Sequence, residues 1–175
     1  MKKFTLVLTL IFALFCTVST IAQEKTNDYT RNFKYGVGLN TGLPFNDPYK
    51  LNIGADARVQ YNVSETYSIT FTTGYNNLIV KDGKDLGYIP VKVGYKTFIF
   101  SNEFYIMGEF GGAFSTTKEY KANSVLFSPS IGYGMKNIDV SLRYEFLKDF
   151  PIIKDGQDDN GLAQIMVRVA YGFDL

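Results

Sequence analysis

The sequence predicts an all-β protein, an eight-stranded antiparallel up-and-down transmembrane β-barrel, and three observations support this fold class. Eight segments alternate apolar and polar residues with a period of two, which is the pattern of a half-buried β-strand. The connections between these segments are alternately short and long. The apolar rows are uncharged and rich in phenylalanine and tyrosine, whereas the polar rows contain many small residues.

Residues 51–61, LNIGADARVQY, show the alternation most clearly. The odd-numbered positions are apolar, and the even-numbered positions are polar, charged or glycine. Successive side chains of a strand point to opposite faces, so this segment predicts one apolar and one polar face, whereas a helix would scatter the same residues around its circumference. Its length also suits a barrel strand, because about 9–11 tilted residues cross a bilayer.

Three further strands are predicted in the first half of the chain, over residues 33–41, 67–75 and 89–97. Their alternate apolar positions are Tyr35, Val37 and Leu39; Tyr67, Ile69 and Phe71; Ile89, Val91, Val93 and Tyr95. The positions between them are mainly glycine, serine, threonine and lysine. Pro90 lies near the end of its segment, where we expect it to disturb the strand little.

The second half of the chain predicts strands over residues 104–114, 125–135, 138–146 and 163–173. Their alternate apolar positions are Phe104, Ile106, Phe110 and Phe114; Val125, Phe127, Ile131 and Tyr133; Ile138, Val140, Leu142, Tyr144 and Phe146; Ile165, Val167, Val169, Tyr171 and Phe173. Pro129 conflicts with this pattern, because proline cannot donate to a ladder and a closed barrel has no edge. We therefore expect a bulge or a broken ladder near Pro129.

The connections predict which end of the barrel faces which compartment. Residues 62–66, 98–103 and 136–137 are short, whereas residues 42–50, 76–88, 115–124 and 147–162 are longer and carry turn residues and charge. Short turns on the periplasmic side and long loops outside are typical of outer-membrane barrels. An even number of strands places both termini on the periplasmic side.

Side-chain size indicates which face of the barrel points outward. The interior of an eight-stranded barrel is only just wide enough for side chains. The many aromatic rings of the apolar rows would not fit there, whereas the small residues of the polar rows suit a narrow lumen. We therefore predict that the apolar rows face lipid. The alternative is a secreted, soluble, lipocalin-like carrier, in which the same alternation would point its apolar face inward.

Aromatic residues of the apolar rows recur near the short-turn end of nearly every predicted strand. They are Tyr35, Tyr61, Tyr67, Tyr95, Phe104, Tyr133 and Tyr171. In the folded barrel we expect them to form an aromatic girdle at one membrane interface.

With these features the chain resembles the small eight-stranded outer-membrane β-barrels of Gram-negative bacteria, of the OmpA/OmpX type, with a porin-like barrel domain. The resemblance covers residues 33–173. Val167, Val169, Tyr171 and Phe173 resemble the assembly signal of that family's last strand, although the chain continues to Asp174 and Leu175. The resemblance implies an outer-membrane location, contact with outer-membrane lipid, recognition by the barrel-assembly machinery during biogenesis, and no wide pore. It does not fix the function, because the family includes structural, adhesive and host-defence proteins.

Charged residues on the polar rows are expected to lie in the lumen. Six of them form the predicted lumen charge network: Asp56, Arg58, Glu109, Arg143, Glu145 and Arg168. Lys34, Lys92, Lys96 and Asp139 lie on the same rows. An unpaired buried charge is costly, so we expect ion pairs that plug the barrel, with local pockets beside the lumen glycines. A charge-selective path and a catalytic carboxylate pair are the alternatives.

The N-terminus predicts a secretory signal peptide over residues 1–22. Lys2 and Lys3 precede an apolar run that is too short to cross a membrane as a helix, and Thr20-Ile21-Ala22 offers small residues for cleavage. An N-terminal membrane anchor is the alternative. Residues 23–32 then form a short polar periplasmic leader, and residues 33–175 form the barrel. The single cysteine, Cys16, lies within the signal, so the mature chain has no thiol.

Composition argues against several functions. The 18 basic and 17 acidic residues are nearly balanced, which gives no indication of nucleic-acid binding. The absence of histidine removes the commonest general base and metal ligand. We predict no enzyme activity, no catalytic or metal-binding residues and no cofactor. The leading hypothesis is a non-enzymatic integral outer-membrane protein whose loops serve envelope structure, adhesion or an unknown extracellular partner. A narrow passive channel and the soluble carrier are the alternatives.

Overall fold

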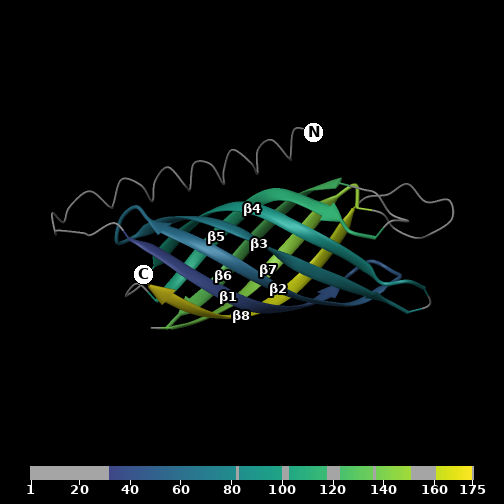
Figure 1. Ribbon diagram of the computed structural model, residues 1–175, viewed down its shortest axis with the longest axis horizontal. Coiled ribbons are helices and arrows are strands. Elements are labelled where there is room, and N and C mark those ends of the chain that lie inside the picture. Colours follow the sequence, from purple (N-terminus) through teal and green to yellow (C-terminus); the bar gives the residue numbers. More distant parts are fainter. Residues whose placement is uncertain are drawn as a thin grey trace. The chain divides into compact units, whose positions relative to one another are not determined.

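The computed structural model describes residues 32–81, 83–99, 103–117, 123–135, 137–150 and 161–174. These residues form one closed barrel of eight antiparallel strands in sequence order, as Figure 1 shows. The strands are β1 (Phe33–Pro44), β2 (Tyr49–Asn62), β3 (Tyr67–Val80), β4 (Leu86–Ile99), β5 (Phe104–Ser115), β6 (Asn123–Gly134), β7 (Ile138–Lys148) and β8 (Leu162–Asp174). The predicted fold class is confirmed. The predicted signal peptide and residues 23–31 of the predicted leader lie outside the described residues.

Every strand extends farther than predicted at the long-loop end. β3, for example, continues to Val80 rather than to residue 75, and β4 begins at Leu86 rather than at residue 89. The added residues lack a clean apolar–polar alternation, which is why the sequence pattern stopped short of them. The barrel wall is therefore taller, and the long loops are shorter, than the alternation alone indicated.

Pro129 interrupts one ladder of β6 without shifting its register. β6 and β7 pair at Phe127 with Phe146 and again at Ser130 with Arg143, with no pair between these two. The ladder from β6 to β5 is continuous past the same proline. Because proline has no N–H to donate, the gap falls on one side only. The broken ladder predicted near Pro129 is confirmed, and the strand accommodates it without a bulge.

Pro90 behaves in the same way, contrary to expectation. It lies inside β4, and the β3–β4 ladder lacks pairs between Thr73 with Val91 and Asn76 with Tyr88. The register on the two sides of the gap is the same. The prediction that Pro90 would disturb the strand little was wrong, because β4 begins three residues earlier than the sequence indicated.

The register sets the tilt of the strands. Cross-strand partners followed from Tyr35 through β2 to β8 lead to Ala163, whose carbonyl accepts a hydrogen bond from the Phe45 N–H. One turn around the barrel thus ends ten residues beyond its start. A stagger of this kind accompanies strand tilts of about 35–45° and an interior that side chains can fill. Residues far apart in sequence are thereby brought to one level of the lumen.

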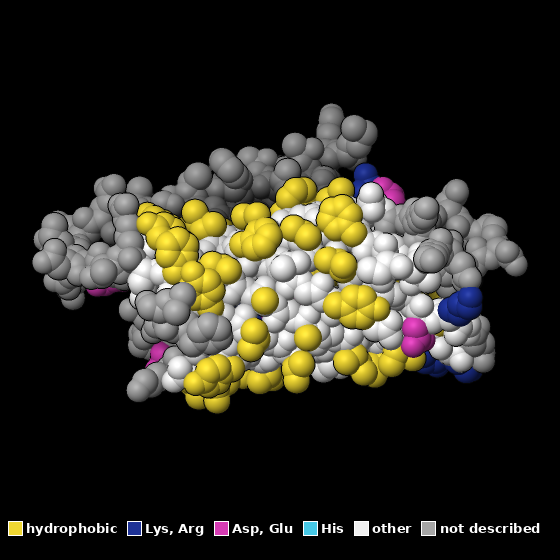
Figure 2. Space-filling view, viewed as in Figure 1, with side chains coloured by type: hydrophobic (Ala, Val, Ile, Leu, Met, Phe, Trp, Pro, Cys, Tyr) yellow, Lys and Arg dark blue, Asp and Glu magenta, His cyan; other side chains and the backbone are white. Residues whose placement is uncertain are grey.

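The apolar rows point outward and the polar rows point inward. Exposed apolar side chains occur on every strand, and the buried polar residues include most charges of the polar rows. On the face drawn in Figure 2, hydrophobic side chains cover the side of the barrel, and charged side chains appear only toward its ends. The predicted orientation is confirmed, and it argues against the soluble carrier. Among the described residues, no helix is long and apolar enough to cross a membrane.

Candidate functional site

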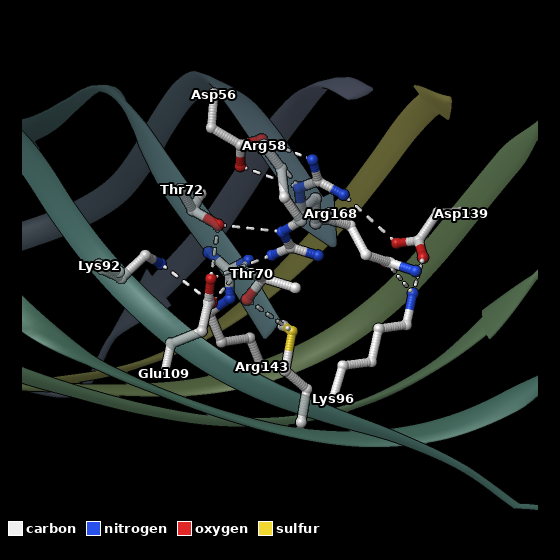
Figure 3. Close-up of polar contacts among 12 residues, drawn as sticks. Asp56, Arg58, Thr70, Thr72, Lys92, Lys96, Glu109, Asp139, Arg143 and Arg168 are labelled. Atoms are coloured by element: carbon white, nitrogen blue, oxygen red, sulfur yellow. Dashed lines mark hydrogen bonds and ion pairs between the residues drawn. The ribbon is translucent and has the colours of Figure 1, made fainter. Parts of the chain in front are cut away.

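The centre of the lumen is a cluster of cations around Glu109, here called the Glu109 group (Figure 3). Arg58 Nη2 lies 3.3 Å from one carboxylate oxygen of Glu109, and Lys92 Nζ lies 3.3 Å from the other. Arg143 Nη2 is farther away, at 3.5 Å. The Thr72 hydroxyl donates a 2.7 Å hydrogen bond to the same carboxylate. One buried acid on β5 thus binds side chains from β2, β3, β4 and β7.

A second cluster, the Asp56 group, joins β1, β2, β4, β7 and β8. Arg168 donates hydrogen bonds of 2.6 to 2.9 Å to both carboxylate oxygens of Asp56, and the Asn40 amide donates a further one of 2.9 Å. Arg168 Nη1 also lies 3.3 Å from Asp139, which accepts a 3.2 Å hydrogen bond from Lys96. Two cations and two carboxylates therefore balance each other.

Glu145 connects the Glu109 group to the next layer of the lumen. Lys92 Nζ lies 3.3 Å from Glu145 and so bridges the two acids. The Tyr88 hydroxyl and the Gln164 amide each donate to Glu145, at 2.9 and 3.0 Å. Asn52 in turn donates to the Tyr88 hydroxyl at 3.0 Å. These contacts place a polar layer directly below the long-loop end.

Above that layer lies a cluster of buried hydrophobic side chains, which we call the apolar cap. Its members are Tyr49, Leu78, Val80, Leu86, Tyr88, Ala113, Leu126, Leu147, Phe150 and Leu162. The Tyr88 ring packs edge-on against Phe150, with centroids 5.5 Å apart, while its hydroxyl belongs to the polar layer. Phe150 follows Asp149, whose φ of 55° turns the chain out of β7. Most cap residues lie where the sequence predicted loops, whereas Ala113 and Leu126 belong to predicted strands.

Tyr105 fills the lumen toward the short-turn end. Its hydroxyl donates to Asp139 at 2.8 Å, and Lys96 Nζ lies 3.7 Å from the centre of its ring. The ring covers Gly132 so closely that a Cβ there would collide with it. The predicted pocket beside a lumen glycine is therefore wrong at Gly132, because a neighbouring strand supplies the bulk.

In the structure, all six predicted network residues make ion pairs or hydrogen bonds. They do not form one network by themselves, because three further residues connect them. Lys92, Lys96 and Asp139 link the members, and sequence analysis placed them only on the same rows. These three residues reach the network members because the strands are staggered, and the alternation pattern does not specify that stagger. The apolar cap was missed entirely. Its only sequence signal is a run such as Val125-Leu126-Phe127, where apolar residues occupy both faces.

The seven predicted girdle residues lie on the outer surface toward the short-turn end. Tyr95, Phe104 and Tyr171 are exposed, and the other four are partly exposed. Phe104 and Tyr133 pair across β5 and β6 with ring centroids 4.6 Å apart, and Tyr67 stacks on Tyr95 at 6.0 Å. Their role at a membrane interface remains a prediction.

Among the described residues, no group of three or more histidine, cysteine, aspartate or glutamate side chains could hold a metal ion. The carboxylates that lie deepest in the lumen are each bound by cations. This arrangement therefore holds paired charges in fixed positions inside the barrel.

No family model matches the sequence, and no curated protein matches it. Solved structures with the same fold do match. The N-terminal barrel domain of Pseudomonas aeruginosa OprF is 9% identical, with a TM-score of 0.57 over 82% of this chain and 100% of that chain. Yersinia pestis Ail, the attachment invasion locus protein, in complex with the heparin analogue sucrose octasulfate, is 14% identical, with a TM-score of 0.55 over 83% of this chain and 100% of that chain.

A de novo designed transmembrane β-barrel is equally similar, at 14% identity and a TM-score of 0.53 over 80% of this chain and 95% of that chain. At these identities the likeness concerns the fold, and the designed barrel illustrates that the fold alone specifies no biological role. This chain therefore has the fold and the lipid-facing surface of a small outer-membrane β-barrel. Ail of Yersinia pestis and OprG of Pseudomonas aeruginosa share the fold and are outer-membrane proteins, which supports the predicted location.

Proposed function

We propose that this protein is a non-enzymatic integral protein of a bacterial outer membrane, with a closed lumen and four loops held at the cell surface. The observation that supports the proposal most is the filled interior. The Glu109 and Asp56 groups occupy its centre, and the apolar cap occupies its long-loop end. A barrel built in this way serves as a rigid support for loops, and its biological role would be envelope structure, adhesion or partner binding.

The two kinds of filling resist conduction for different reasons. The buried ion pairs hold side chains from facing walls in place, and breaking one leaves an uncompensated charge. The apolar cap offers a permeating ion few polar groups to replace its water, and losing that water costs many kcal/mol in a dry environment. An ion would have to cross both layers.

The loops are the proposed site for an extracellular partner, and the lipid-facing rows are the proposed contact with outer-membrane lipid. Ail, which shares the fold, was crystallised with a heparin analogue, so a small barrel of this type is able to present a ligand site. We further propose that residues 1–22 are removed as a signal peptide, that residues 23–32 remain in the periplasm, and that the barrel-assembly machinery inserts the chain.

Recording from planar bilayers tests the closed lumen. The purified, refolded protein should give no steady openings, and protease resistance of the inserted barrel should show that folded protein is present. Reproducible ion-selective openings that change in Arg143→Ala or Glu109→Ala would contradict the proposal and favour the narrow channel. The role of the loops is tested separately. Binding of the protein to whole bacteria or to host-cell surfaces is compared between the native sequence and variants in which each loop is shortened in turn.

A further inference from the structure

We infer that the lumen contains a binding site for one small inorganic anion, such as chloride, beside Arg143 between β6 and β7. The first evidence for this site is the balance of charges among the described lumen residues. The Asp56 group pairs Arg168 and Lys96 with two carboxylates and is neutral. The Glu109 group and Glu145 together hold two carboxylates against three cations. The surplus positive charge is therefore located in this second set.

Among its three cations, Arg143 has the weakest contact with a carboxylate. Its Nη2 lies 3.5 Å from Glu109, whereas Arg58 and Lys92 each approach that acid to 3.3 Å. Nε and Nη2 of Arg143 have no hydrogen-bond partner among the described residues, although the side chain is only 2% exposed. A buried guanidinium with two unsatisfied N–H groups is costly, so an acceptor at this position would be strongly favoured.

Two serine hydroxyls lie on the strand next to Arg143. Ser130 on β6 is the cross-strand partner of Arg143, and Ser128 precedes it by two residues on the same inward face. Both are buried, and both hydroxyls lack a hydrogen-bond partner among the described residues. The gap in the β6–β7 ladder covers Ser128 and Pro129.

This combination suits an anion better than a neutral acceptor. Hydroxyl and guanidinium groups can all donate at once to a single halide, whereas a water molecule has only two lone pairs to offer and leaves the surplus charge uncompensated. The geometry therefore indicates a monovalent inorganic ion, bound as the barrel folds around it.

The chloride dependence of unfolding tests the site. The refolded barrel is unfolded with urea at constant ionic strength while chloride replaces gluconate, a bulky anion. A ligand that binds only the folded state raises the unfolding midpoint as its concentration rises. We expect such a rise for the native sequence, its loss in Arg143→Met, and its reduction in the double variant Ser128→Ala/Ser130→Ala.

Ser124→Ala is the matched control. Ser124 is also an inward, buried serine of β6 with an unpartnered hydroxyl, but it lies toward the apolar cap. Its substitution should leave the chloride dependence unchanged. If Arg143→Met does not fold, the serine variants still decide the question, because they keep the charge and remove only hydroxyl groups.

Two results would overturn the inference. One is an equal midpoint in chloride and gluconate for the native sequence, as expected if Lys92 were uncharged or if water alone met Arg143. The other is a chloride effect that the Arg143 and serine variants retain. Crystals grown in bromide give a direct check. An anomalous peak within hydrogen-bond distance of the Arg143 guanidinium supports the site, and its absence counts against it.

Discussion

Arg168 and Asp56 form a pair across a strand that lies between them. Arg168 is on β8 and Asp56 is on β2, and both strands flank β1. The guanidinium passes over Gly38 of β1, where an added Cβ would lie 2.9 Å from its central carbon. The absence of a side chain at Gly38 is thus what allows three hydrogen bonds of 2.6 to 2.9 Å to form.

This relationship predicts the effect of removing one partner. Arg168→Met should lower the free energy of unfolding by about 3–5 kcal/mol, because it leaves Asp56 buried without its cation. The double variant Asp56→Asn/Arg168→Met should lose clearly less than the sum of the single variants. Urea unfolding of the refolded barrel measures both.

The control for this pair is Lys148→Met. Lys148 lies 4.0 Å from Asp149, but both side chains are mostly exposed, at 67% and 72%. Exposed pairs contribute about 0–1 kcal/mol. Additive losses in the double variant would show that Arg168 and Asp56 do not interact in the folded barrel.

The lipid-facing surface predicts a cost that depends on depth. Val93 is 56% exposed near the middle of β4, and Val93→Arg should cost about 2–4 kcal/mol if that level is the bilayer midplane. Val125 is 51% exposed near the long-loop end, opposite Lys148, and Val125→Arg should cost only about 0–1 kcal/mol. Unfolding from lipid vesicles measures the difference. Equal costs would place the membrane elsewhere on the barrel.

The glycine under Tyr105 predicts a position-specific effect. Gly132→Ala should displace the ring and weaken its contacts with Asp139 and Lys96, at a cost of about 1–3 kcal/mol. Gly134→Ala, on the same strand and face, is the control. The nearest atom to a Cβ there would be the Glu103 carbonyl oxygen at 3.8 Å, so the cost should stay within about 0.5 kcal/mol. A smaller loss at Gly132 than at Gly134 would contradict the packing described.

The orientation in the membrane predicts where trypsin cuts intact cells. Cleavage is expected in the long loops, at Lys84, Lys118 or Lys154, and the short turn at Lys136 should be protected until the outer membrane is opened. Mass spectrometry of the released peptides identifies the sites. Cleavage at Lys136 in intact cells would show that the barrel has the opposite orientation in the membrane.

The sequence predicted the number of strands and the two faces of the barrel, because alternation depends only on the side-chain directions within each strand. Which side chains meet within the lumen depends also on the register between the strands. Arg58 meets Glu109 across β3 and β4 only because the register fixes which residues share a level. Leu147 illustrates the other limit. It follows the apolar Phe146, so alternation ended there, although the strand continues and turns Leu147 inward.

That inward packing predicts a difference between two leucines of β7. Leu147 pairs with Leu126 and Leu162, and all three are fully buried in the apolar cap. Leu147→Ala should therefore cost about 2–5 kcal/mol, since it removes packing and leaves a cavity. Leu142→Ala, on the lipid side of the same strand, should cost less, because lipid chains are able to fill the space. Urea unfolding of both variants in the same vesicles compares them. If Leu142→Ala lowered the free energy of unfolding as much as Leu147→Ala, packed side chains would not close the long-loop end of the lumen. The proposal of a closed barrel would then no longer be supported by the apolar cap.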